Sequence, residues 1–279
     1  MHSLAMLDAP LAGEPLPAWF ARIADALLNG HRLRGGGDTQ LRLLEVEAYL
    51  NAPSLDHADP FTHSDDMQLT SRRWYFHREG GSYRGGTFKG LDISFATAPG
   101  AYGGWLIRSL ETADGNVVNG VGLCVDTLLA KTGFESVADL DAAIAGRAVD
   151  DASSPLHLEP RQSGERRDVI ATARVGLTLK RAAQHPDMPR YLGRAYRFVT
   201  RGRELAKGRP QLVVALHEAG GGLASVIDGS GGAPDKVMEQ IAAYDEGVAT
   251  ADLGPWMGRG IEPRDVPRVL GAWRGLHGR

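Results

Sequence analysis

The sequence has a single cysteine, Cys124, and it lacks any long run of apolar residues. One cysteine cannot form an internal disulfide or a cysteine-rich zinc or iron–sulfur site. No apolar run reaches the ~20 residues that cross a bilayer, and the first thirty residues lack the basic start and apolar stretch of a secretory signal. We therefore expect a cytoplasmic protein that does not enter a membrane.

The chain also lacks a strong overall charge, because 31 Lys and Arg residues stand against 34 Asp and Glu residues. The basic residues are nevertheless concentrated in one segment. Residues 161–209 contain thirteen Lys or Arg and four Asp or Glu, whereas the rest of the chain contains eighteen and thirty. A basic segment in an otherwise acidic chain is what binding to a phosphate backbone requires. A solvated charged face is the alternative explanation.

Hydrophobic residues make up 43% of the 279 positions and charged residues 23%, which is typical of a folded globular protein. Helical spacing of apolar residues predicts helices between Pro17 and Gly30, over 120–132 and 136–146, and around 237–241 and 266–273. Strands are predicted over 39–49, 91–95 and 105–110. Residues 51–73 and 151–168 are expected to be polar loops, and the glycine-rich stretch 220–232 a flexible connection.

One predicted strand carries two carboxylates on the same face. Alternation over residues 44–49 places Glu45, Glu47 and Tyr49 on one side and the apolar residues on the other. Two residues along a strand span about 6.6 to 6.8 Å, and two carboxylates at that separation raise each other's proton affinity when they are partly buried. This face is therefore a candidate for acid–base chemistry, with a solvated strand face as the alternative.

Other polar residues could converge on this face. Arg108 lies among apolar neighbours on a predicted strand, where a guanidinium needs a partner or a ligand. His57 and His63 lie in the polar loop that follows Glu47, and Tyr49 and Tyr83 could form aromatic walls. A metal site made of the two histidines and a carboxylate is an alternative, but their spacing is not that of a common metal motif.

Six motifs occur in order along the chain: Leu-Glu-Val-Glu-Ala-Tyr-Leu at 44–50, His63-Ser64, Leu-Ile-Arg-Ser-Leu-Glu at 106–111, Gly-Val-Gly-Leu-Cys at 120–124, Ala-Arg-Val-Gly-Leu at 173–177 and Tyr-Arg-Phe-Val at 196–199. This ordered set resembles the alkyladenine (3-methylpurine) DNA glycosylase family over residues 17–203. The resemblance implies an α+β domain over residues 1–205, with a curved, largely antiparallel sheet and surrounding helices, similar to the formyltransferase C-terminal-domain-like fold of that family. Residues 206–279 would form a C-terminal helical extension.

The resemblance also implies a function, a monofunctional DNA glycosylase that takes part in base excision repair. Such an enzyme hydrolyses the N-glycosidic bond of a modified purine and needs no cofactor and no metal. Glu47 matches the family's glutamate that activates water, and Arg108 matches an arginine near its active site. Tyr49 and His63 match stacking and hydrogen-bonding positions, and Tyr83 is a looser match for a second stacking tyrosine. A nucleotide handled in this way is extruded from the base stack.

Two positions depart from the family pattern. The hairpin that wedges into the duplex usually carries a tyrosine followed by a glycine, but this chain has Arg84-Gly85-Gly86-Thr87-Phe88. Asp92 stands where the family has an asparagine that helps to reject guanine. Two other functions therefore remain open: a catalytically inactive nucleic-acid-binding protein of the same fold, and a hydrolase redirected to a nucleoside or small molecule.

The expected partner is damaged DNA, either duplex or single-stranded, contacted through the basic segment 161–209. We expect the protein to act as a monomer. The expected site residues are Glu47, Arg108 and His63 for catalysis, and Tyr49, Tyr83 and Asp92 for substrate binding.

Overall fold

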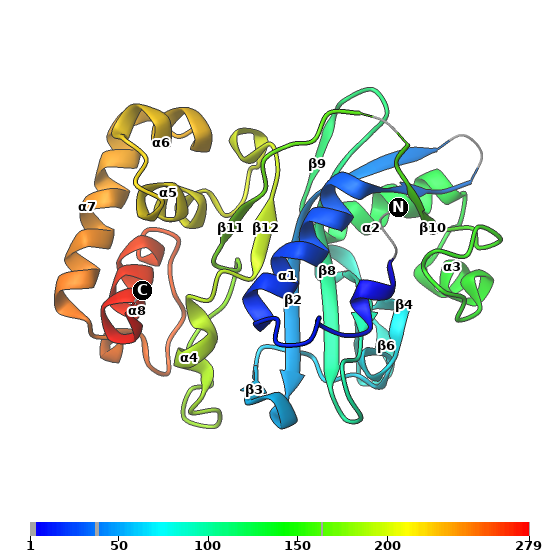
Figure 1. Ribbon diagram of the computed structural model, residues 1–279, viewed down its shortest axis with the longest axis horizontal. Helices are drawn as coiled ribbons and strands as arrows, with labels where there is room; N and C mark the ends of the chain where they lie inside the picture. Colours follow the sequence, from blue (N-terminus) through cyan, green and yellow to red (C-terminus); the bar gives the residue numbers. More distant parts are fainter. Residues whose placement is uncertain (1–3, 37–38, 163, 279) are drawn as a thin grey trace. The chain divides into compact units, whose positions relative to one another are not determined.

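The computed structural model describes residues 4–36, 39–162 and 164–278 (Figure 1). The chain forms two compact units, one built from Met1–Ala58 and Thr62–Val169 and the other from Asp59–Phe61 and Ile170–Arg279. Residues 170–205 thus cluster with the C-terminal helices, and the domain boundary expected after residue 205 stays a prediction. Within the described ranges, no helix is long and apolar enough to cross a membrane.

The first unit is built on a curved antiparallel sheet with strand order β10-β1-β2-β8-β7-β4 (Figure 1). Register shifts interrupt the β2–β8 ladder near Glu45, and such bulges increase the local bend and twist of a sheet. The predicted α+β class with a curved antiparallel sheet is confirmed. The strands of this unit are β1 His31–Arg34, β2 Gln40–Ala52, β3 His57–Ala58, β4 Ser71–Phe76, β5 Arg78–Glu79, β6 Ser82–Tyr83, β7 Leu91–Phe95, β8 Tyr102–Glu111, β9 Val117–Asn119 and β10 His157–Pro160.

The helix α1, Leu16–Asp25, covers the apolar face of this sheet (Figure 1). Phe20 meets the Trp105 ring edge-on, with ring centroids 5.8 Å apart, and Trp19 meets Phe95 at 5.6 Å. All four aromatic side chains are buried, and the predicted helix is confirmed. The other helices of the unit are η1 Leu4–Leu7, η2 Ala26–Gly30, η3 Pro53–Leu55, η4 Asp66–Leu69, η5 Gly86–Phe88, α2 Val121–Thr132 and α3 Val137–Ile144.

The second unit combines a short antiparallel ribbon with a group of helices (Figure 1). Its elements are β11 Ile170–Thr172, α4 Met188–Leu192, β12 Arg197–Val199, η6 Gly202–Glu204, α5 Arg209–Glu218, α6 Leu223–Ser230, α7 Pro234–Thr250, η7 Gly254–Trp256 and α8 Val266–His277. The backbones of α7 and α8 approach each other so closely at Gly271 that a Cβ there would overlap the Tyr244 carbonyl oxygen. Both helices were expected from their apolar spacing and are confirmed.

Two loop predictions are wrong. The segment 151–168 contains β10, which pairs with β1 along four residues. This strand is too short to show a clear alternation in the sequence, and its hydrogen-bond partners lie in β1, far away in the chain. The stretch 220–232 contains α6, in which Val226 is fully buried. Most of its glycines lie before and after α6, and Gly229 lies within the last turn of the helix.

Candidate active site

Four strands place a row of side chains on the sheet face opposite to α1. Tyr75 of β4 pairs with Asp92 of β7, Asp92 pairs with Leu106 of β8, and Leu106 pairs with Glu47 of β2. Directly paired residues of antiparallel strands point to the same face. Glu47 and Asp92 therefore lie two strand spacings apart, about 10 Å. Glu47 and Asp92 are buried, at 0% and 2% exposure, and Glu45 is also buried. The carboxylates on β2 therefore do not form a solvated strand face.

Glu47 belongs to a tightly connected polar group. The Tyr49 hydroxyl donates to Glu47 Oε2 at 2.8 Å, and Arg108 Nη1 donates to the same oxygen at 3.4 Å. Arg108 also donates through Nε to Glu45 Oε1 at 3.2 Å. The second oxygen of Glu45 accepts from the Ser109 hydroxyl at 2.6 Å. The sequence predicted that Arg108 needs a partner, and the structure provides two carboxylates.

Arg108 is the positively charged member of this group. Burial opposes the charged form of Arg108, but the nearby Glu47 and Glu45 raise its guanidinium pKa above the ordinary value. Arg108 therefore remains a cation between two carboxylates. With both carboxylates ionised, the group carries a net charge of −1 that is shielded from solvent. Such a group can stabilise positive charge that develops on a bound molecule.

A second polar group lies at the Asp92 end of the row. His77 Nε2 and Asp92 Oδ1 are 2.7 Å apart, and Gln68 Nε2 donates to Asp92 Oδ2 at 3.3 Å. The His63 ring meets the His77 ring edge-on at a centroid distance of 4.3 Å, and the Tyr75 hydroxyl lies 3.4 Å from His63 Nδ1. Sequence reasoning missed His77 and Gln68. The available signal was alternation, since His77 follows Tyr75 by two positions at the end of β4.

The environment of His63 predicts a pH effect on stability. Loss of solvent around the ring and the charge of His77 lower the pKa of His63 from 6.5 to about 4. Between these values the unfolded chain binds more protons than the folded chain, so stability falls as the pH drops from 6.5 towards 4. The ring loses solvent on the side that faces His77, but the residue as a whole is exposed. This exposure decides the size of the effect, because solvent screening reduces it to about 1 kcal/mol.

Urea unfolding of wild type and His63→Asn between pH 4 and 7 measures this contribution. The variant should lose less stability than wild type on acidification. His185→Asn, which changes an exposed histidine, should follow the wild-type curve. Parallel curves for wild type and His63→Asn would contradict the assignment.

Gly104 allows the Asp92 group to lie close to β8. A Cβ at this position would overlap Asp92 Oδ2 and lie 2.8 Å from Gln68 Nε2. We expect Gly104→Ala to displace both side chains and to lower the free energy of unfolding by about 1–3 kcal/mol, as for other overpacked sites. Gly85→Ala is the matched control, because a Cβ at Gly85 meets nothing within 4 Å and its φ is −99°. Equal stabilities of the two variants in urea unfolding would refute this packing argument.

The structure separates Tyr83 from these two groups. Its hydroxyl donates to Asp141 Oδ2 at 2.6 Å and accepts from Arg78 Nη2 at 2.9 Å. The Arg78 guanidinium also lies over its ring, 4.7 Å from the centroid. Of the six predicted site residues, Glu47, Tyr49 and Arg108 come together, His63 and Asp92 belong to the second group through His77, and Tyr83 contacts α3 instead.

The alternative metal site of His57 and His63 receives no support from the described residues. His57 is buried, and its Nδ1 lies 2.8 Å from the Leu50 carbonyl oxygen. In the described part of the chain, no three or more His, Cys, Asp or Glu side chains gather in a way that could hold a metal ion. His57 therefore has a packing role beneath α1, where its ring meets Phe20 edge-on.

The basic segment 161–209 is divided between the two units. Arg174 and Arg197 are almost fully buried; Arg174 donates to Asp59 Oδ2 at 2.6 Å, and Arg197 donates to the Gly208 carbonyl oxygen at 3.0 Å. These two side chains contribute to the fold of the second unit rather than to an exposed basic surface.

The described fold and contacts define an α+β protein with a buried acid–arginine group on one sheet face. No known family model matches the chain. It is similar to the uncharacterized protein L759 of Acanthamoeba polyphaga mimivirus, with 33% identity over 178 residues that cover 58% of this chain and 80% of the viral protein. The chain belongs to the same family as this viral protein, whose name states no activity.

Proposed function

We propose that the protein is a monofunctional DNA glycosylase that releases a modified purine by hydrolysis of its N-glycosidic bond. The observation that carries the proposal is the buried position of Glu47, which accepts from both the Tyr49 hydroxyl and Arg108 on a polar sheet face. The ordered motifs that resemble the alkyladenine DNA glycosylase family support the same function. We also propose that the curved sheet has the fold of that family.

The contacts of Glu47 suit the chemistry of this reaction. The C1′–N bond breaks with its electron pair passing to the departing base, and positive charge develops on the sugar. Glu45, Glu47 and Arg108 together carry a net negative charge with both carboxylates ionised, which stabilises the sugar cation electrostatically. Glu47 then accepts a proton from the water that adds to C1′. Tyr49 and Arg108 hold the carboxylate in one orientation for this step.

The second polar group is the proposed recognition element for the base. With a pKa of about 4, His63 is neutral at pH 7, so one ring nitrogen can donate and the other accept. Asp92 already accepts from His77 and Gln68 through its two oxygens. We therefore assign the direct base contact to His63, with Asp92 acting through His77.

A groove in the first unit supports a nucleic-acid partner. Arg32, Arg42, Arg161 and Arg167 line a space of about 360 Å³. Arg167 is paired with Glu111, at 2.7 and 3.1 Å, but Arg42 and Arg161 donate to backbone or amide oxygens instead. Burial and the charges of Arg167 and Arg161 lower the pKa of Arg42 to about 10. Repulsion among guanidinium groups is relieved when a phosphate binds between them.

This groove predicts a specific change in the salt dependence of DNA binding. Arg161→Gln should weaken binding to a 20-nucleotide probe several-fold and lower the slope of log K against log salt by about 0.7–0.9, the value of one phosphate contact. Arg166→Gln is the control, because Arg166 is more exposed and is paired with Asp25. Fluorescence anisotropy at several salt concentrations gives the slopes. Equal slopes for the two variants would remove the groove from the DNA interface.

Base release tests the proposal directly. Wild-type protein is incubated with duplexes that carry 3-methyladenine, hypoxanthine or ethenoadenine, and with the same lesions in single strands and free nucleosides. Release from either DNA form supports the glycosylase. Release from nucleosides alone would establish the redirected hydrolase instead, and DNA binding without any release would establish the inactive nucleic-acid-binding protein.

A further inference from the structure

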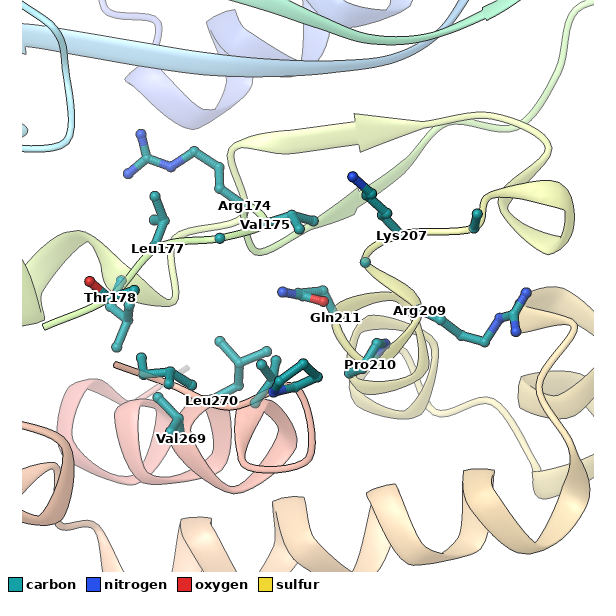
Figure 2. Close-up of a pocket in the computed structure, with 17 residues that line it drawn as sticks. Arg174, Val175, Leu177, Thr178, Lys207, Arg209, Pro210, Gln211, Val269 and Leu270 are labelled. Atoms are coloured by element: carbon teal, nitrogen blue, oxygen red, sulfur yellow. The ribbon is translucent and has the colours of Figure 1, made fainter. Parts of the chain in front are cut away.

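The second unit contains a cavity that the proposed glycosylase chemistry does not use. It has a volume of about 390 Å³ and lies among the loop 174–178, the start of α5 and the start of α8 (Figure 2). Its walls are largely apolar, with Leu177, Val269 and Leu270 among the lining side chains. Small-molecule sites commonly have this size and an apolar lining with a few polar groups.

One buried polar side chain extends into this cavity. Gln211 is 5% exposed, and Figure 2 shows it reaching from α5 into the space between Val175 and Leu270. Its Oε1 has no hydrogen-bond partner among the described residues. A buried acceptor without a hydrogen bond destabilises the folded state. A bound molecule that donates an N–H or O–H to Gln211 would remove this destabilisation.

The neighbouring Arg174 does not offer its guanidinium to a molecule in the cavity. It also lines the cavity, but its guanidinium points away from the space (Figure 2) and donates to Asp59 Oδ2. Both side chains of this ion pair are fully buried. Gln211 is therefore the buried side chain that offers an unpaired acceptor to the cavity.

The lining of the cavity includes a basic residue. Lys207 lines it and is exposed, and it forms no ion pair with a described residue. The helix α5 begins at Arg209, after the N-cap residue Gly208, and no side chain caps its first turn. The unpaired N–H groups at a helix start carry partial positive charge. An acidic group on a bound molecule would be attracted to this end of the cavity.

We propose that the second unit binds a small amphipathic organic anion in this cavity. The apolar body packs against Leu177, Val269 and Leu270, an N–H or hydroxyl donates to Gln211 Oε1, and the acidic group lies towards Lys207. This site is separate from Glu47 and belongs to the C-terminal helices, so its existence does not depend on base release.

The probe 1-anilinonaphthalene-8-sulfonate has all three parts: fused apolar rings, one N–H and a sulfonate. We expect saturable binding to the full-length protein at one site, measured by fluorescence and by calorimetry. Gln211→Leu should weaken binding about five- to tenfold, and Leu177→Trp, which fills the cavity, should abolish it. Gln184→Leu makes the same chemical change at an exposed position outside the cavity and should bind as wild type does.

Thermal unfolding without the probe separates a binding role of Gln211 from a structural one. Because Gln211→Leu removes a buried unpaired acceptor, its melting temperature should equal or exceed that of wild type. A lower melting temperature would assign Gln211 a structural role and overturn the proposal. So would the absence of saturable binding to wild type, or equal binding to wild type, Gln211→Leu and Leu177→Trp.

Discussion

Replacement of Glu47 by glutamine is expected to slow release of a modified purine by about 10²–10⁴-fold, the typical contribution of a positioned general base. The amide keeps the size of the carboxylate but cannot accept the water proton, and it removes negative charge from the group around Arg108. Single-turnover base release from a lesion-bearing duplex measures the chemical step. Binding of the same duplex should remain within a few-fold of wild type, because Glu47 is buried and makes no contribution to an exposed basic surface.

Glu45→Gln is the matched control for this experiment. Glu45 shares Arg108 with Glu47 and is also buried, but it accepts from Ser109, whereas Tyr49 donates to Glu47. We expect Glu45→Gln to slow release by less than about tenfold, because only charge near the site changes. An equal loss in both variants would show that the pair acts through its charge alone. Full activity of Glu47→Gln would eliminate Glu47 as the base.

Replacement of Arg108 by methionine is expected to lower the free energy of unfolding by about 3–5 kcal/mol, the usual cost of removing one partner from a buried ion pair. Arg108 is 8% exposed and lies between the carboxylates of Glu45 and Glu47. Without the guanidinium, two buried carboxylates face each other across a low-dielectric space. Urea unfolding at pH 7 measures the change.

Two further variants identify the cause of that loss. Adding Glu45→Gln and Glu47→Gln to Arg108→Met should restore much of the stability, because the repelling charges are then gone. Arg166→Met is the surface control, and loss of its exposed pair with Asp25 should change the free energy of unfolding far less than Arg108→Met does. A loss below 1 kcal/mol for Arg108→Met would mean that the two carboxylates do not depend on the guanidinium.

Local sequence patterns predicted many elements of the first unit. The apolar spacing around Trp19 and Phe20 matches α1, and the alternation of residues 44–49 matches β2, which extends further at both ends. These patterns work because the period of side chains along a helix or strand follows from backbone geometry alone. The same patterns failed for β10 and α6, which are short and obtain their stability from partners that are distant in the sequence, such as β1 for β10.

The site was only partly predictable for the same reason. Alternation correctly placed Glu45 and Glu47 together, and the apolar neighbours of Arg108 indicated that it needs a partner or a ligand. The pairing of His77 with Asp92 spans fifteen residues and depends on the register between β4 and β7. No sequence pattern indicated Gln211, because the cavity that it enters is formed by segments up to 96 positions apart, from Arg174 to Leu270.

The amino-acid sequence by itself determined which side of β2 carries carboxylates, which side of α1 is apolar, and that Arg108 needs a partner or a ligand. Only the tertiary structure decided which carboxylates neutralise Arg108, that Tyr83 contacts Asp141, and that His63 lies against His77. The physical reason is that periodicity sets the face of an element, whereas the register and packing between elements set which faces meet.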